Sequence, residues 1–276
     1  MMEAVAPSLA SPPSPMIDLT LQTVLILITA AFAAGFVDSI AGGGGLITIP
    51  ALLLAGFPPV AALGTNKLQG MFGSGSATIH YAANGQVDLR RQLPWALLAF
   101  VGGAIGALLA TAVPGDLLRA LLPILLIAIA LYFAFKPNMG DVDRAERLSS
   151  FLFGLTIVPA VGLYDGLFGP GTGSFLMLAF VALAGYGVLK ATAHTKLLNF
   201  ASNIGGFFVF AAVGVVYWKI GLMTGVAQFV GARLGASLAI KVGAKLIKPL
   251  LVIVCVALAV KLLADPANPI RQLIGV

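Results

Sequence analysis

Apolar segments of helical length follow one another along this chain, and they restrict its possible folds more than any other feature. Hydrophobic residues make up 59% of the 276 positions and charged residues only 9%, with a mean hydropathy of +1.03. Soluble domains carry about 25% charged residues, so a soluble protein of this size could not bury so much apolar surface. We therefore predict an all-α integral membrane protein that crosses the lipid bilayer several times.

Eight apolar segments have helical length, and most of them reach the length of about 20 apolar residues that one crossing needs. They cover residues 19–39, 60–82, 93–112, 117–136, 148–165, 188–212, 217–238 and 243–264. Two further apolar stretches, 46–55 and 174–184, are too short to cross alone. Each of them directly follows a glycine-rich break. We expect each to form a broken or re-entrant helical unit with the helix before it.

The basic residues favour six full crossings plus two hairpins over eight simple crossings. Cytoplasmic loops are enriched in Lys and Arg, and only the first scheme places all three basic clusters on one side. These clusters are Arg90 and Arg91, then Lys136, Arg144 and Arg147, then Lys241, Lys245 and Lys248. The scheme leaves four loop charges on or near the other side, namely Arg119, Lys190, Lys219 and Arg271. Both termini then face outward and the two halves form an inverted repeat, as in many transporters.

Five regions follow from this division of the chain. They are a disordered N-terminal tail (1–18), a first transmembrane repeat (19–137), a connecting loop (138–147), a second transmembrane repeat (148–264) and a C-terminal tail (265–276).

A duplicated motif supports the two repeats. In the first half, Asp38 precedes four consecutive glycines, and Lys67 follows 29 residues after the aspartate. In the second half, Asp165 precedes another glycine-rich loop, and Lys196 follows 31 residues after it. The loop glycines are Gly42, Gly43, Gly44 and Gly45 in the first copy and Gly169, Gly171 and Gly173, with Thr172, in the second.

The glycine loops are the first candidate binding elements. Backbone that leaves helical geometry inside a bilayer is tolerated only where it is buried in protein or lines a wet cavity. Glycine permits the unusual dihedral angles and lets a ligand approach the chain closely. A helix that starts at such a break directs N–H groups and a positive dipole end at an anion. The alternative is that these glycines only permit close helix packing.

The two lysines and their polar neighbours are the second candidate. A charge at the centre of a bilayer is costly and tends to face a partner or a transport pathway. The alternative is that each lysine extends to the membrane interface. Hydrogen-bonding side chains stand beside the lysines, namely Asn66, Gln69, Thr195 and Asn199. Asp38 and Asp165 either pair with the lysines, cap the short helices or carry a proton, and Arg233 is a further anion contact or an ion-pair partner.

Other classes of function find no support. Cys255 stands alone, which excludes an intrachain disulfide and a multi-cysteine metal site. We predict no metal, no cofactor and no nucleic-acid partner, because the basic residues lie in short loops where they determine topology. No nucleophile–base pair, phosphate-binding loop or dinucleotide-binding motif is present, so we do not expect an enzyme.

The motif beginning at Asp38, running through Gly42–Gly45 to Pro50 and followed by Asn66 and Lys67, resembles the TauE/SafE sulfite-exporter family of membrane permeases. The second-half loop and Lys196 fit the same repeated pattern, and the similarity covers about residues 20–264. The resemblance implies a permease for sulfite, organosulfonates or related anions, usually directed outward. The second half differs from the first, because Pro170 replaces a glycine and Thr195 stands at the position that corresponds to Asn66.

Together these observations predict a secondary transporter in the bacterial inner membrane. Its substrate, a small sulfur-containing anion, would bind at midplane between the two glycine loops. The alternatives are a carrier of another small anion, such as a carboxylate, or an anion channel. The sequence leaves open whether the protein is a monomer or a homodimer.

Overall fold

The computed structural model describes residues 20–112, 131 and 140–264, and every regular element in these residues is helical. The elements are α1 (Leu21–Ala41), α2 (Gly45–Leu54), α3 (Pro59–Ala83), α4 (Leu89–Ala110), α6 (Ser150–Leu152), the π-helix η1 (Phe153–Ile157), α7 (Val158–Leu167), α8 (Thr172–Ala182), α9 (Val188–Ala212), α10 (Trp218–Val242) and α11 (Ala244–Ala264). The predicted tails, and the predicted segment 117–136 apart from residue 131, lie outside the described residues.

Four helical stretches in the described part are long and apolar enough to cross a membrane. They are α1, α4, the continuous stretch Ser150–Leu167 and α10. Four of the eight predicted segments therefore meet this standard within the described residues, and the segment 117–136 lies outside them apart from residue 131. Helices α3 and α9 are 25 residues long, but they carry many buried polar side chains and are not among these four. Burial inside the protein, rather than contact with lipid, accommodates these side chains.

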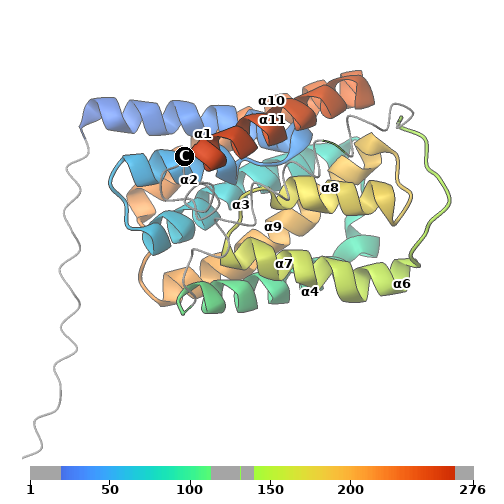
Figure 1. Ribbon diagram of the computed structural model, residues 1–276, viewed down its shortest axis with the longest axis horizontal. Coiled ribbons are helices and arrows are strands. Elements are labelled where there is room, and N and C mark those ends of the chain that lie inside the picture. The colour runs from blue at the N-terminus through green and yellow to red at the C-terminus, as the bar shows by residue number, and fades with distance from the viewer. Residues whose placement is uncertain (1–19, 113–130, 132–139, 265–276) are drawn as a thin grey trace, which may run out of the picture.

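The long helices exchange partners between the two halves of the chain. Helix α4 packs against α7 and α9 of the second half, and α10 packs against α1 and α3 of the first half. Helices α3 and α9 also contact each other, and this contact joins the two sets of helices (Figure 1). The described helices therefore form two packing groups, α1–α3 with α10 and α7–α9 with α4, which do not coincide with the sequence halves.

Glycines on α4 and α10 make these exchanges possible. A Cβ atom added at Gly106 would lie 2.0 Å from the carbonyl oxygen of Leu163 in α7. A Cβ atom added at Gly235 would lie 2.3 Å from the carbonyl oxygen of Phe36 in α1. A second glycine precedes each of these by four residues, Gly102 on α4 and Gly231 on α10. These second glycines also touch the partner helix. Small residues four apart let membrane helices approach backbone to backbone.

The two short helices begin near the middle of the molecule and extend toward opposite ends (Figure 1). Their preceding loops touch at the centre. A Cβ atom on Gly42 would lie 2.5 Å from the backbone nitrogen of Ser174, and the Ser174 hydroxyl donates to the Ala41 carbonyl at 3.1 Å. The predicted glycine breaks thus meet each other where the chain leaves helical geometry.

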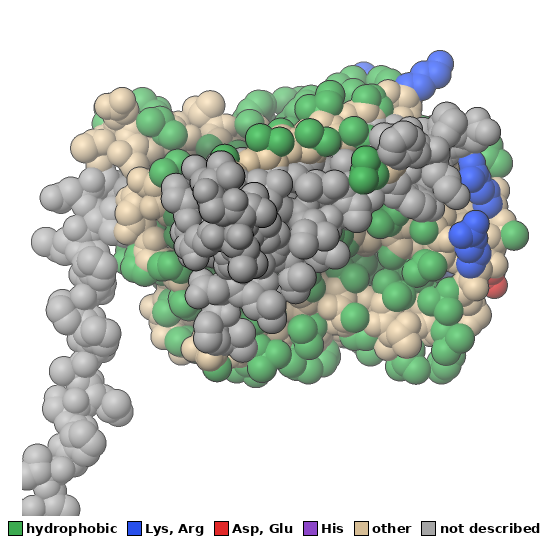
Figure 2. All heavy atoms as spheres, viewed as in Figure 1, with side chains coloured by type: hydrophobic (Ala, Val, Ile, Leu, Met, Phe, Trp, Pro, Cys, Tyr) green, Lys and Arg blue, Asp and Glu red, His purple; other side chains and the backbone are tan. Residues whose placement is uncertain are grey.

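Lys and Arg side chains gather toward one end of the visible face (Figure 2). Asp141 connects the segments of this end, because its carboxylate accepts hydrogen bonds from the backbone nitrogens of Leu189 and Ala244. Lys190 pairs with Asp143 at 2.5 Å. Lys190 therefore lies at the same end as Arg144 and Lys245, and the prediction that placed it on or near the other side was wrong. That assignment overlooked that α8 returns the chain to the end where α6 begins.

Candidate functional site

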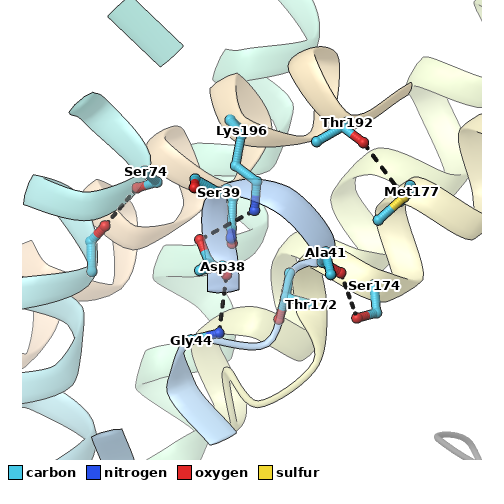
Figure 3. Close-up of polar contacts among 12 residues, drawn as sticks. Asp38, Ser39, Ala41, Gly44, Ser74, Thr172, Ser174, Met177, Thr192 and Lys196 are labelled. Atoms are coloured by element: carbon cyan, nitrogen blue, oxygen red, sulfur yellow. Dashed lines mark hydrogen bonds and ion pairs between the residues drawn. The ribbon is translucent and has the colours of Figure 1, made fainter. Parts of the chain in front are cut away.

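Two buried ion pairs join the halves of the chain at the centre of the molecule. Lys67 in α3 pairs with Asp165 in α7, with 2.9 Å between Nζ and Oδ2. Lys196 in α9 pairs with Asp38 in α1 at 3.1 Å (Figure 3). Both lysine side chains are only 1% exposed. The alternative in which these lysines extend to the interface is therefore wrong, because each finds an opposite charge inside the protein.

Further hydrogen bonds fix the two carboxylates. Asp38 accepts from the backbone nitrogen of Gly44 at 3.0 Å and so caps the start of α2 (Figure 3). Asp165 accepts from the hydroxyls of Thr172, at 2.8 Å, and Ser202, at 2.7 Å. Pairing with a lysine and capping of a short helix are thus combined in Asp38. Asp165 also pairs with a lysine, but its other hydrogen bonds come from side-chain hydroxyls rather than from the backbone of α8.

The glycine loops adopt backbone conformations that other residues rarely adopt. Gly42 and Gly43 have φ angles of 81° and 93°, and Gly169 and Gly171 both have φ angles of 83°. Glycine reaches this region without the steric cost of a Cβ atom. These angles turn the chain after α1 and after α7, so that α2 begins at Gly45 and α8 begins at Thr172.

A small cavity lies between the two loops and the helices α3, α9 and α10. It offers about 20 Å³ to the centre of a water molecule. The residues that line it are Asp38, Gly43, Gly44, Gly45, Asn66, Gly70, Asp165, Gly169, Gly173, Asn199, Asn203 and Gln228. We refer to it below as the central cavity.

Donor groups of two asparagines flank the starts of the short helices. The Asn66 side-chain nitrogen is 3.5 Å from the position of a Cβ atom on Gly45. The Asn199 side-chain nitrogen is 3.7 Å from the corresponding position on Gly173. The oxygen of Asn66 already accepts from the Thr48 hydroxyl at 2.6 Å, so its amide nitrogen is the end directed at the loop.

Comparison with known proteins identifies the family. The sequence profile described as "Sulfite exporter TauE/SafE" matches residues 27–262. The chain belongs to the TauE/SafE family. It is 64% identical over 260 residues to a "Probable membrane transporter protein ORF9" of Sinorhizobium sp, covering 94% of this chain and 100% of that protein. It is 50% identical to the "Probable membrane transporter protein YfcA" of Escherichia coli K12, covering 87% and 89% of the two chains.

A third relative, a "Probable membrane transporter protein" of Haemophilus influenzae, is 45% identical over 90% of this chain and 97% of its own length. No solved structure matches the chain. The family and these relatives identify a membrane transporter that crosses the bilayer more than once. The predicted membership of the TauE/SafE family is confirmed.

The predicted site residues of this TauE/SafE protein fall into three groups. Nine line the central cavity: Asp38, Gly43, Gly44, Gly45, Asn66, Asp165, Gly169, Gly173 and Asn199. Six others stand behind it or shape its loops: Gly42, Lys67, Gln69, Gly171, Thr172 and Lys196. Thr195 is buried but does not line the cavity, and Arg233 lies on the exposed face of α10.

Three lining residues were not among the predicted site residues, namely Gly70, Asn203 and Gln228. Gln228 gave the clearest signal, since it is a polar residue within the apolar segment 217–238. Its place at the cavity follows from the packing of α10 on the first half of the chain. That packing is not visible in the local sequence.

The carboxylates, not the ammonium groups, reach the surface of the central cavity. Asp38 and Asp165 line it, whereas Lys67 and Lys196 lie behind them. The four charges sum to zero. The site therefore presents two carboxylates, amide groups and glycine backbone to a ligand, and the two lysine ammonium groups lie behind the carboxylates.

Proposed function

We propose that this protein is a secondary transporter that exports small sulfur-containing anions, such as sulfite or organosulfonates, across the bacterial inner membrane. Membership of the TauE/SafE family and the names of its relatives support a transporter, and the family description supports the sulfur-containing anion. Alternating access between the two sides of the membrane is the expected mechanism of such a carrier.

One observation carries the proposal of a binding site. The starts of α2 and α8 face one enclosed cavity, and the amide nitrogens of Asn66 and Asn199 stand beside them. Helix starts and amide donors together suit an oxyanion. Lys67 and Lys196 balance the charges of the two lining carboxylates, so the site carries no net negative charge before an anion enters.

The size of the cavity implies that transport requires movement. The space open to the centre of a water molecule is only about 20 Å³. It holds about one water molecule and cannot hold a complete sulfite or sulfonate. We therefore propose that the central cavity is closed here and opens when the two packing groups shift. If the two sequence halves moved as rigid bodies instead, α4 would have to separate from α7 and α10 from α1. We therefore propose that the two packing groups, rather than the sequence halves, move relative to each other.

Thermal unfolding of the detergent-purified protein against an anion panel tests the proposal. The panel contains sulfite, thiosulfate, sulfoacetate, sulfate, acetate and chloride. A ligand that binds only the folded protein raises the melting temperature as its occupancy grows. We expect stabilisation by sulfite or a sulfonate, and its loss in Asn199→Ala, which removes one donor at the cavity.

Asn84→Ala is the matched control, because Asn84 is an exposed asparagine at the end of α3. Its response to the anions should equal that of the wild type. Stabilisation by acetate alone would reject the sulfur-containing substrate and retain an anion carrier. Flux in vesicles that fails to saturate with substrate would reject the carrier in favour of a channel.

A further inference from the structure

Gln228 is the one residue of the central cavity whose buried acceptor is left without a partner among the described residues. Its side-chain oxygen accepts no hydrogen bond there, and the residue is only 3% exposed. Leaving a buried carbonyl oxygen unpaired is unfavourable, because folding removes its hydrogen bonds to water and returns none. Because Gln228 also lines the central cavity, its unpaired oxygen is a candidate ligand contact once the cavity opens.

The surrounding chain makes room for this glutamine. Its Cγ atom lies 2.9 Å from the position of a Cβ atom on Gly35 in α1. Its side-chain nitrogen lies 2.8 Å from the corresponding position on Gly73 in α3. Any larger residue at either glycine would displace the glutamine. Two close contacts thus hold Gln228 between α1 and α3, where it forms part of the lining of the central cavity.

No equivalent of Gln228 occurs on the other side of the cavity. The backbone carbonyl of Gln228 contacts Gly35 in α1, and the backbone carbonyl of Ala99 in α4 contacts Gly162 in α7 in the same manner. Ala99 therefore occupies the equivalent position, and its methyl side chain has no polar atom. Gln228 makes the otherwise similar walls of the cavity chemically different.

The polar groups at the cavity surface restrict the ligand further. The lining residues supply acceptors from the carboxylates of Asp38 and Asp165 and from the side-chain oxygens of Asn203 and Gln228, whereas Asn66 and Asn199 supply donors. An anion without a hydrogen-bond donor would satisfy the asparagines but leave the Gln228 oxygen unpaired. An anion that carries a hydroxyl, an amine or an acidic proton would satisfy both kinds of group.

We infer that Gln228 is a specificity-determining residue, whose side-chain oxygen accepts a hydrogen bond from a donor group on the transported anion. The inference rests on the proposed function and narrows its substrate class to donor-bearing anions, such as hydrogen sulfite or hydroxy- and amino-substituted sulfonates. The donor group lies against α10, and the sulfur oxyanion lies against the starts of α2 and α8.

Two monoanions with the same carbon skeleton test this inference on the purified full-length protein. Ethanesulfonate has no donor, whereas 2-hydroxyethanesulfonate carries one hydroxyl and the same charge at every working pH. Titration calorimetry should show about five- to tenfold tighter binding of the hydroxylated compound by the wild type. Gln228→Leu should bind both compounds with equal affinity.

Gln92→Leu is the matched control. Gln92 is also buried in the described structure, at 4% exposure, with an unpaired side-chain oxygen, but it lies in α4 away from the central cavity. This variant should keep the preference for the hydroxylated compound. Persistence of the preference in Gln228→Leu would overturn the inference.

The wild type alone provides a second test, which does not depend on the folding of any variant. Equal binding of the two sulfonates would overturn the role of Gln228 and leave the proposed substrate class intact. Binding of neither sulfonate, with stabilisation by carboxylates in the same preparation, would reject the proposed substrate class and this inference with it.

Discussion

The two buried ion pairs are formed by equivalent residues of the two sequence motifs, but the structure holds them unequally. Asp165 receives two hydroxyl hydrogen bonds in addition to Lys67, and Lys67 also donates to the Asp165 backbone carbonyl. Asp38 receives one backbone N–H in addition to Lys196. The second-half carboxylate is therefore better solvated by the protein. Equivalent residues in the two motifs therefore form ion pairs of unequal stability.

The packing framework itself is closely similar in the two packing groups. Gly106 contacts the Leu163 carbonyl in the same manner as Gly235 contacts the Phe36 carbonyl. The differences lie in the polar groups attached to this framework. We conclude that the glycine contacts set the positions of the helices, whereas the side chains between them make the two ion pairs, and the two walls of the cavity, unequal.

The largest effect should come from removing one lysine. Lys196→Met leaves the Asp38 carboxylate buried with one hydrogen bond, and we expect a loss of about 3–5 kcal/mol in the free energy of unfolding. Lys67→Met should cost about 1–2 kcal/mol less, because Asp165 keeps its bonds from Thr172 and Ser202. Denaturant unfolding in detergent measures the difference, and equal losses would contradict the inequality of the pairs.

The double variant Lys196→Met with Asp38→Leu serves as the control for this experiment. Removing both charges leaves no unpaired ion, so most of the lost stability should return. A double variant as unstable as Lys196→Met would show that the packing around the pair, not its charge, controls stability.

An intermediate effect should follow from filling the glycine contacts. Gly106→Ala and Gly235→Ala each place a methyl group within 2.4 Å of a backbone carbonyl, so the paired helices must separate. We expect each substitution to cost about 1–3 kcal/mol, and the two costs to be similar if the framework is equivalent in the two packing groups. Gly140→Ala is the control, because no atom lies within 4 Å of its added Cβ. Melting temperatures that differ strongly between the two variants would contradict the equivalence.

The smallest effect should come from an ion pair outside the central cavity. The side chains of Lys190 and Asp143 are 40% and 49% exposed, so water screens their attraction. Burial raises the pKa of Asp143, but the Gly187 N–H and the Lys190 ammonium lower it more, and the net pKa lies below the ordinary value of 3.8. We expect Asp143→Asn to cost less than about 1 kcal/mol at pH 7.

The pH dependence of that variant has a definite sign. A carboxylate whose pKa is lowered by folding stabilises the protein above its unfolded pKa, and the contribution is lost as the pH falls through the folded pKa. The difference between Asp143→Asn and the wild type should therefore be present at pH 7 and vanish below the lowered pKa. A difference that grows on acidification would contradict this ion pair.

The sequence by itself determined the class of protein and the position of its irregular backbone. Low charge and long apolar segments require a membrane fold, because both depend on composition along a single stretch of chain. The predicted segment 188–212 coincides with α9, and the glycine breaks fall where the φ angles turn positive. These features are local, so local sequence is sufficient to predict them.

Only the tertiary structure decided which groups meet. Asp38 pairs with Lys196, 158 residues away, rather than with Lys67 of its own motif. The exchange of α4 and α10 between the halves, and the entry of Gln228 into the cavity, likewise depend on contacts between distant helices. A buried charge is stabilised by whichever opposite charge the packed helices bring within about 3 Å, and helix packing is a property of the whole chain.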